Sequence, residues 1–394
     1  AIAAWRSRWY ALRRLLGALL LGAIVACCFP HALYTVLRVP LIEWDARSIW
    51  LFHGKAIWVH GGIAPDYFAD PSFARWSHTD YPLLLPVQSA VIGVLRGEWS
   101  EMAVKGFLGL NFMASLWLLH ATLVRRGWSH LLSWCASILM MGVALAQYVN
   151  GYADNHYAMP LALAALLAFQ PNRSAGCGAL AALLAGIALN VKNEAFPYVL
   201  LGAVLWGLLW LVRHMRGHRK ESWLPTRCMW GILLVGVVPF CLWLLFRSVH
   251  GVEGDLHLGS RLLTPGASIS LWIQRAPVIL DAMGRMHVQL HTPLLFGMVL
   301  ALTLWARVLA KDVRATSDVL TGEEHVLWGG VVVTHLLLLS VYGLTPYDVR
   351  WHLGTSLSRL LVLPVLLLAG LGVCAVEKVL GYQGNRPPSE PVGK

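Results

Sequence analysis

The stretch LIEWDARSIW (residues 41–50) decides how this chain is interpreted, because it places three charged side chains directly behind the first long apolar segment. Charge at that position must lie at a membrane surface. In a helix, the apolar residues here and in the next turns share one face, as in helices that lie in the plane of the interface. Glu43 and Arg47 are four residues apart and can pair. Asp45 is expected to have no partner, which suggests a functional role.

The composition indicates an integral membrane protein. Of the 394 residues, 57% are apolar and 13% charged. A soluble domain of this size would leave too much apolar surface in water. The seven cysteines have no paired spacing and indicate neither disulfides nor a metal site. The net charge of +11 does not indicate nucleic acid, because the basic residues follow the predicted membrane sides rather than one patch.

The apolar runs predict an all-α polytopic membrane protein with about ten transmembrane helices. One transmembrane domain is expected over residues 1–379, followed by a short cytoplasmic tail over 380–394. Arginines before the first run predict a cytoplasmic N-terminus. The spans are predicted near residues 15–36, 103–124, 131–149, 157–170, 177–191, 195–212, 228–248, 293–310, 326–342 and 357–376.

The first extracytoplasmic loop is predicted over about residues 38–81, with juxtamembrane helices continuing to about residue 102. The apolar run 82–95 is too short to cross a bilayer, so we assign it to a juxtamembrane helix on the same side. Arg125-Arg126 then faces the cytoplasm. This topology places most basic residues inside and most acidic ones outside, as expected for a protein of the bacterial cytoplasmic (inner) membrane with its working surface on the extracytoplasmic side.

Four outward-facing segments carry polar residues at the membrane edge, and we expect their side chains to share one cavity because ionised groups are costly in lipid. Simpler interpretations stay open: Arg47 as a headgroup anchor, Asp154 as a helix cap, and Lys192 paired only with Glu194. The candidate site residues are Glu43, Asp45, Arg47, Asp80, Tyr81, Asp154, Lys192, Glu194, Asp348, Arg350, His352 and Arg359.

The order of these features resembles the GT-C superfamily of integral-membrane glycosyltransferases, which use polyprenyl-phosphate-linked sugars, and in particular its protein O-mannosyltransferase and aminoarabinose-transferase branch. The resemblance covers about the first 210 residues. The similar elements are the acidic loop with Glu43 and Asp45, the entry Asp80-Tyr81-Pro82 to a juxtamembrane helix, Arg125-Arg126 followed by a span and Asp154, and an apolar helix ending at Lys192.

The resemblance implies that Asp45 acts as the base, that Asp154 supports the site and that Lys192 meets the lipid phosphate. Many members carry a large soluble domain after the last span, whereas few residues follow the last span predicted here. The acceptor, a lipid, glycan or protein, therefore stays open.

The candidate residues include the groups that an inverting glycosyltransferase needs to act on a polyprenyl-phosphate donor. One base must deprotonate the acceptor hydroxyl, and positive charge must steady the departing phosphate. Asp45 is the candidate base. The candidates for holding the phosphate are Lys192 and Arg350, with Arg47 and Arg359 in reserve. A divalent cation shared by Asp45 and Asp154 is compatible with the sequence but not required, and no other cofactor is indicated.

Two alternative functions come from other classes. A lipid-linked polysaccharide polymerase or ligase would share the topology, although its late extracytoplasmic loop is usually much longer than the moderate one predicted over residues 250–291. A secondary transporter would place ionisable residues near the middle of its spans and often shows an internal repeat. We see neither feature.

Overall fold

The computed structural model describes residues 34, 38–70, 72, 76–168, 175–215, 227–252, 254, 265–290, 292, 295–301 and 322–379. All regular elements in these ranges are helices, which confirms the predicted all-α class. Three helical segments are long and apolar enough to cross a membrane, namely Glu101–Arg125, Glu324–Leu344 and Val349–Val376. The chain is an integral membrane protein. The predicted span 15–36, most of the predicted span 293–310 and the tail 380–394 lie outside the described residues.

The described helices follow most of the predicted spans within a few residues. Their bounds are η1 (Ala46–Trp50), α2 (Leu51–His60), α3 (Pro65–Phe68), α5 (Leu84–Arg96), α6 (Glu101–Arg125), α7 (His130–Val149), α8 (Ala153–Ala168), α9 (Ala175–Leu189), α10 (Ala195–Met215), α11 (Arg227–His250), α13 (Pro265–Gln289), α15 (Gly322–Leu344), α16 (Val349–Leu360) and α17 (Val362–Val379). The predicted late loop 250–291 holds a further long helix, α13.

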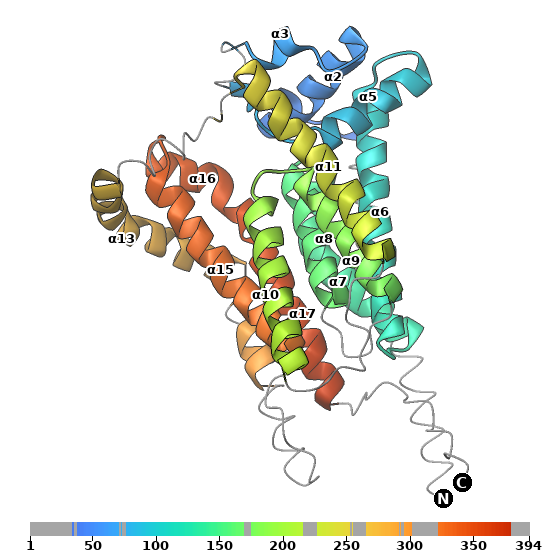
Figure 1. Ribbon diagram of the computed structural model, residues 1–394, viewed down its shortest axis with the longest axis vertical. Helices are drawn as coiled ribbons and strands as arrows, with labels where there is room; N and C mark the ends of the chain where they lie inside the picture. The colour runs from blue at the N-terminus through green and yellow to red at the C-terminus, as the bar shows by residue number, and fades with distance from the viewer. Residues whose placement is uncertain are drawn as a thin grey trace, which may run out of the picture.

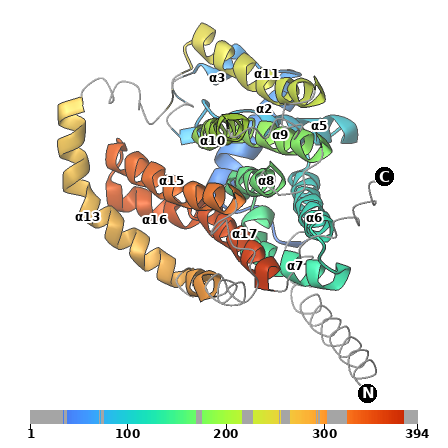
Figure 2. The ribbon, with the colours of Figure 1, turned by 60° about the horizontal axis from the view of Figure 1, so that its bottom comes forward.

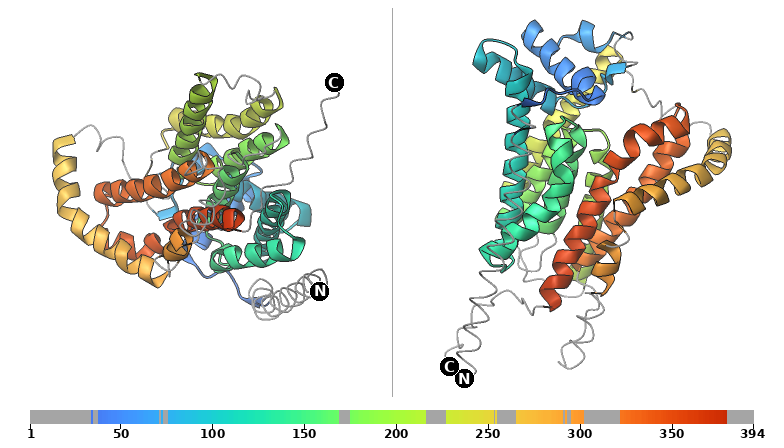
Figure 3. Two further views of the ribbon diagram at one scale, coloured as in Figure 1. Left: turned by 90° about the horizontal axis from the view of Figure 1, so that it is seen from below. Right: turned by 180° about the vertical axis from the view of Figure 1, so that it is seen from behind.

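Residues 38–100 form a helical cap at one end of the bundle, drawn in blue at the top of Figure 1. The run predicted as a juxtamembrane helix is α5, which packs along α2. The two helices approach closely, because a Cβ on Gly93 would meet the Trp58 ring at 2.8 Å. Figure 3 shows α11 reaching up beside the cap, where Trp243 packs on Phe68.

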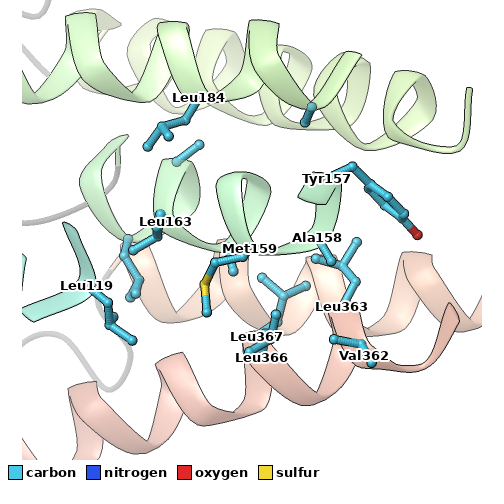
Figure 4. Packing of buried hydrophobic residues seen from close by; sticks show 14 of the residues in the cluster. Leu119, Tyr157, Ala158, Met159, Leu163, Leu184, Val362, Leu363, Leu366 and Leu367 are labelled. Carbon is cyan, nitrogen blue, oxygen red and sulfur yellow. The ribbon is translucent and has the colours of Figure 1, made fainter. Parts of the chain in front are cut away.

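The bundle is organised around α8, which lies among α9, α17, α6, α7 and α10 (Figure 2). Alanine and leucine dominate α8, and almost all of its side chains are buried, so other helices can pack against every side of it. Figure 4 shows Met159 of α8 pointing toward Leu366 and Leu367 of α17. This central position places the first turn of α8 in the middle of the bundle end that the cap covers.

The helix α13 wraps around the outside of α15 and α16 and bends along its length (Figure 2). Pro277 lies inside it, and proline removes a helical hydrogen bond and permits such a bend. Its Arg275 guanidinium donates to the carbonyls of Gly343 and Thr345, at 3.3 and 2.7 Å. These bonds hold the turn between α15 and α16, so α13 helps to fix the start of α16.

Candidate active site

The structure brings five of the predicted site residues into one ion-pair network beneath the cap. Asp45 directly precedes η1, and Asp154 is the second residue of α8. Lys192 and Glu194 lie in the turn between α9 and α10, and Arg359 lies in the last turn of α16. Segments up to 314 residues apart therefore meet at this point.

Positive and negative charges alternate along the network. Arg359 binds Asp45 through Nη1 and lies 3.6 Å from Oδ2 of Asp154. The Lys192 ammonium contacts Oδ1 of Asp154 at 2.8 Å and Oε1 of Glu194 at 3.0 Å. Three carboxylates thus share two cations. Each cation lies between two carboxylates, which is the arrangement that offsets the cost of burying charge.

Exposure differs along the network. The side chains of Arg359, Asp154 and Lys192 are 12%, 2% and 6% exposed, whereas Asp45 and Glu194 are 25% and 27% exposed. The interior of the network is closed and its two ends are open carboxylates. A ligand that approaches from solvent would meet Asp45 or Glu194 first.

Our expectation that Asp45 has no partner was wrong, because Arg359 pairs with it. The expected pair of Glu43 and Arg47 is also absent: Glu43 instead accepts a hydrogen bond of 2.6 Å from the Tyr152 hydroxyl. The Tyr152 ring lies under the Arg359 guanidinium, 4.4 Å from its centroid. Sequence spacing within one helix could not reveal partners that come from α16 and from the turn between α7 and α8.

The turn before α8 fits closely against the cap. Gly151 has φ of +80°, which favours glycine, and a Cβ there would meet Cβ of Ala46 at 2.8 Å. Tyr152 follows at once and was not predicted as a site residue, although it directly precedes the Asp154 segment. Burial, and then its hydrogen bond to Glu43, raises the pKa of the Tyr152 hydroxyl. The hydroxyl therefore stays protonated and serves as a donor.

Lys192 is held in its charged form. Burial disfavours its ammonium, but the carboxylates of Asp154 and Glu194 outweigh that effect and raise its pKa above the usual value. The Tyr81 and Tyr157 rings lie 5.6 and 5.9 Å from Nζ. Lys192 is therefore a permanent cation whose partners are two carboxylates.

Tyr81 connects the cap to this network. Its ring stacks on Trp50 at a centroid distance of 5.2 Å, and its hydroxyl donates to Glu194 at 3.5 Å. Asp80 faces elsewhere: it accepts a 2.9 Å hydrogen bond from Asn193 and lies 3.8 Å from Arg247 of α11. Asp80 thus joins the cap to α11, and its neighbours Asn193 and Arg247 were not predicted.

Of the three predicted residues at the start of α16, two have other contacts. Asp348 caps the helix and accepts a 2.9 Å bond from the Trp351 backbone N–H. His352 contacts the Thr345 hydroxyl at 2.9 Å. Arg350 is exposed and forms no ion pair with a residue that the structure describes. Arg350 and Arg359 are nine positions apart in the helix, about 14 Å along its axis.

A divalent cation shared by Asp45 and Asp154 does not fit this arrangement. The Arg359 guanidinium lies between the two carboxylates, where a shared cation would have to lie. The other oxygen of Asp154 is bound by Lys192. Asp45 and Asp154 therefore cannot bind one metal ion between them, and the proposed chemistry uses no metal.

Comparison with known proteins gave structural matches only. No protein-family model and no curated protein matches the chain. The crystal structure of ArnT from Cupriavidus metallidurans bound to undecaprenyl phosphate matches with a TM-score of 0.46 and 12% identity, covering 94% of this chain and 60% of that one. The same protein in the apo state matches with a TM-score of 0.35 and 13% identity, covering 95% and 78%.

Proposed function

We propose that the protein is an inverting glycosyltransferase that moves a sugar from a polyprenyl-phosphate donor to an acceptor hydroxyl, on the extracytoplasmic face of a bacterial cytoplasmic membrane. The position of Asp45 carries the proposal. Its carboxylate is one of the two partly exposed ends of a network whose interior is closed, and Arg359 holds it in place, so it is oriented yet open to a substrate. A base needs this combination of fixed geometry and access.

The reaction requires little else from the chain. Oδ2 of Asp45 binds Arg359, so Oδ1 is the atom assigned to the acceptor proton. As the proton moves to Oδ1, the acceptor oxygen bonds to the anomeric carbon from the face opposite the phosphate. The bond between that carbon and the phosphate oxygen breaks, and its electron pair leaves with polyprenyl phosphate. Because phosphate leaves readily, no second carboxylic acid is needed.

The donor phosphate needs a cation, and we assign Lys192 to it. The network has more carboxylates than cations, so its net charge does not attract phosphate. Glu194, however, is the exposed partner of Lys192, at 3.0 Å. A phosphate oxygen that displaces Glu194 exchanges one anion for another, and Lys192 is never left uncompensated. Asp154 then positions Lys192 and Arg359 without touching the substrate.

The location of the buried charges argues against the transporter alternative. Asp154 lies at the beginning of α8, Lys192 between two helices and Arg359 near the end of α16. A transporter typically carries its ionisable residues near mid-span. The polymerase or ligase alternative is compatible with the same network. It differs from the proposed function in its donor, which would be a polyprenyl-pyrophosphate glycan.

The test is sugar transfer by the purified protein in nanodiscs, with a radiolabelled polyprenyl-phosphate sugar and, separately, a polyprenyl-pyrophosphate glycan. Wild type should consume only the former. Asp45→Asn should lose transfer by a factor of about 10²–10⁴ while still binding donor. Asp66→Asn is the matched control, because Asp66 is exposed in α3 of the same cap. Near-normal turnover by Asp45→Asn would defeat the assignment, and consumption of the glycan alone would favour the polymerase or ligase.

A further inference from the structure

A groove of about 550 Å³ lies on the outer side of the cap, separate from the ion-pair network. Its volume is in the range of sites that hold small molecules. All of the lining belongs to the cap except the first residue of α6. The lining residues are Ile42, Trp44, Arg47, Ser48, Leu51, Phe52, Lys55, Trp76, Trp99 and Glu101.

One face of the helix that runs through η1 and α2 forms the floor of the groove. Its members recur at helical spacing, from Trp44 through Arg47 and Leu51 to Lys55. The opposite face, with Ala46, is buried against the rest of the protein. The groove and the network are therefore on different sides of the same helix, and Asp45 lies between Trp44 and Ala46 in the chain.

The two cations of the groove are available to a ligand. Arg47 does not pair with Glu43, and neither Arg47 nor Lys55 forms an ion pair with any residue in the described part of the chain. Glu101 is the single acidic residue in the lining. The groove thus presents a net positive charge, which complements an anionic ligand. Arginine can bind a phosphate or carboxylate through two parallel hydrogen bonds.

Aromatic side chains form the walls. The ring centroids of Phe52 and Trp76 lie 5.0 Å apart with the ring planes at 46°, and the Trp99 ring lies 6.2 Å from that of Trp58. A headgroup anchor, our simpler interpretation of Arg47, needs no such walls. Flat aromatic faces combined with cations suit a sugar ring that carries a negative charge, because the C–H face of the ring can stack while the anion meets Arg47 and Lys55.

We propose that this groove binds an anionic saccharide, a sugar that bears a phosphate or carboxylate, at a site distinct from the ion-pair network. A donor attached to a polyprenyl chain must keep that chain in the hydrocarbon, whereas this groove is lined by the cap and not by the apolar parts of the spans. A soluble sugar that reaches the groove from the aqueous side fits that lining.

The experiment measures binding and not transfer, so its failure is distinguishable from failure of the proposed reaction. Full-length protein in phosphatidylcholine nanodiscs is titrated with glucose 6-phosphate, glucose and inorganic phosphate by saturation-transfer NMR. Binding of glucose 6-phosphate should weaken at least about tenfold in Arg47→Gln/Lys55→Gln, since two charge-assisted contacts are lost. Trp76→Ala should weaken glucose 6-phosphate but not inorganic phosphate. Asp45→Asn should bind all three like wild type.

Arg96→Gln is the matched control, because Arg96 is exposed at the end of α5 and pairs with Glu98 at 2.6 Å outside the groove. Unchanged binding in Arg47→Gln/Lys55→Gln would overturn the proposal. If inorganic phosphate bound as tightly as glucose 6-phosphate, the sugar ring would contribute nothing to binding, and the proposal of a saccharide site would be overturned. Competition by phosphatidylglycerol vesicles at equal strength would identify a lipid headgroup site instead and would also overturn it.

Discussion

Arg359, in the last turn of α16, binds the carboxylate of Asp45 at the edge of the cap and also lies 3.6 Å from Asp154 at the start of α8. One guanidinium therefore joins the late half of the chain to both carboxylates that the sequence marked as catalytic. The side chain is 12% exposed, and loss of it would leave Asp154 short of a partner in a closed site.

The first prediction concerns this guanidinium. Arg359→Gln should lower the free energy of unfolding by about 3–5 kcal/mol, because removing one partner of a buried pair leaves an uncompensated charge. A double-mutant cycle with Asp45→Asn should give a coupling of about 0.5–3 kcal/mol, measured by denaturant unfolding in detergent. Simple additivity of the two variants would contradict the ion pair. The double variant should remain destabilised, since Asp154 also depends on Arg359.

The second prediction concerns Glu194. Glu194→Gln should strengthen binding of a polyprenyl phosphate to the purified protein, because it removes the anion that competes for Lys192 at 3.0 Å. A gain of about tenfold corresponds to about 1.4 kcal/mol, the scale of one charge-assisted contact. Glu98→Gln serves as the control, because Glu98 is exposed and pairs with Arg96. Weaker binding in Glu194→Gln would show that Glu194 helps to hold the ligand instead of competing with it.

The third prediction concerns the crossing of α9 and α11. A Cβ on Gly186 would meet the backbone of Gly236, and Asn190 donates to the Gly236 carbonyl at 2.6 Å beside this crossing. Gly186→Ala should destabilise the protein by about 1–3 kcal/mol, because two helix backbones must separate. Gly202→Ala in α10 should be neutral or stabilising, since open space surrounds that position and alanine favours helix. Thermal unfolding of the two variants checks this, and equal midpoints would refute the close crossing.

The fourth prediction is a pH dependence that arises in the cap. Burial, and secondarily the nearby His78, lowers the pKa of His53 from 6.5 to about 3. Between these values the unfolded chain binds a proton that the folded protein does not. The free energy of unfolding should therefore fall as the pH falls below 6.5 toward 3, by an amount on the order of a few kcal/mol.

His53→Leu removes this titration and keeps an apolar side chain among the rings of Phe68 and Tyr67. Its unfolding free energy should depend less steeply on pH than that of wild type over the same range. His60→Leu is the control, because His60 is exposed at the end of the same helix. Parallel curves for wild type and His53→Leu would show that His53 is not the group responsible.

Much of the helical fold could be predicted from local patterns in the sequence. The apolar runs predicted the helices from α6 to α11, α15 and α17, because a span is a property of consecutive residues, whereas most of α16 was not part of a predicted span. The run 82–95 was correctly predicted as a short helix, because its length excludes a comfortable crossing. The sequence also predicted that four polar segments share one site, and Asp45, Asp154, Lys192, Glu194 and Arg359 do meet, whereas Asp80 and Arg350 of the same set do not join them.

Only the tertiary structure decided which charge lies against which. Arg359 is paired with Asp45, Tyr152 with Glu43, and Arg47 faces a groove rather than its neighbour four residues away. Burial raises the energy of any unpaired charge, so partners are chosen by the packing of α8, α16 and the cap and not by spacing along one helix. The same packing puts a guanidinium between Asp45 and Asp154, where the sequence allowed but did not require a metal ion, and leaves two cations of the cap available to a ligand.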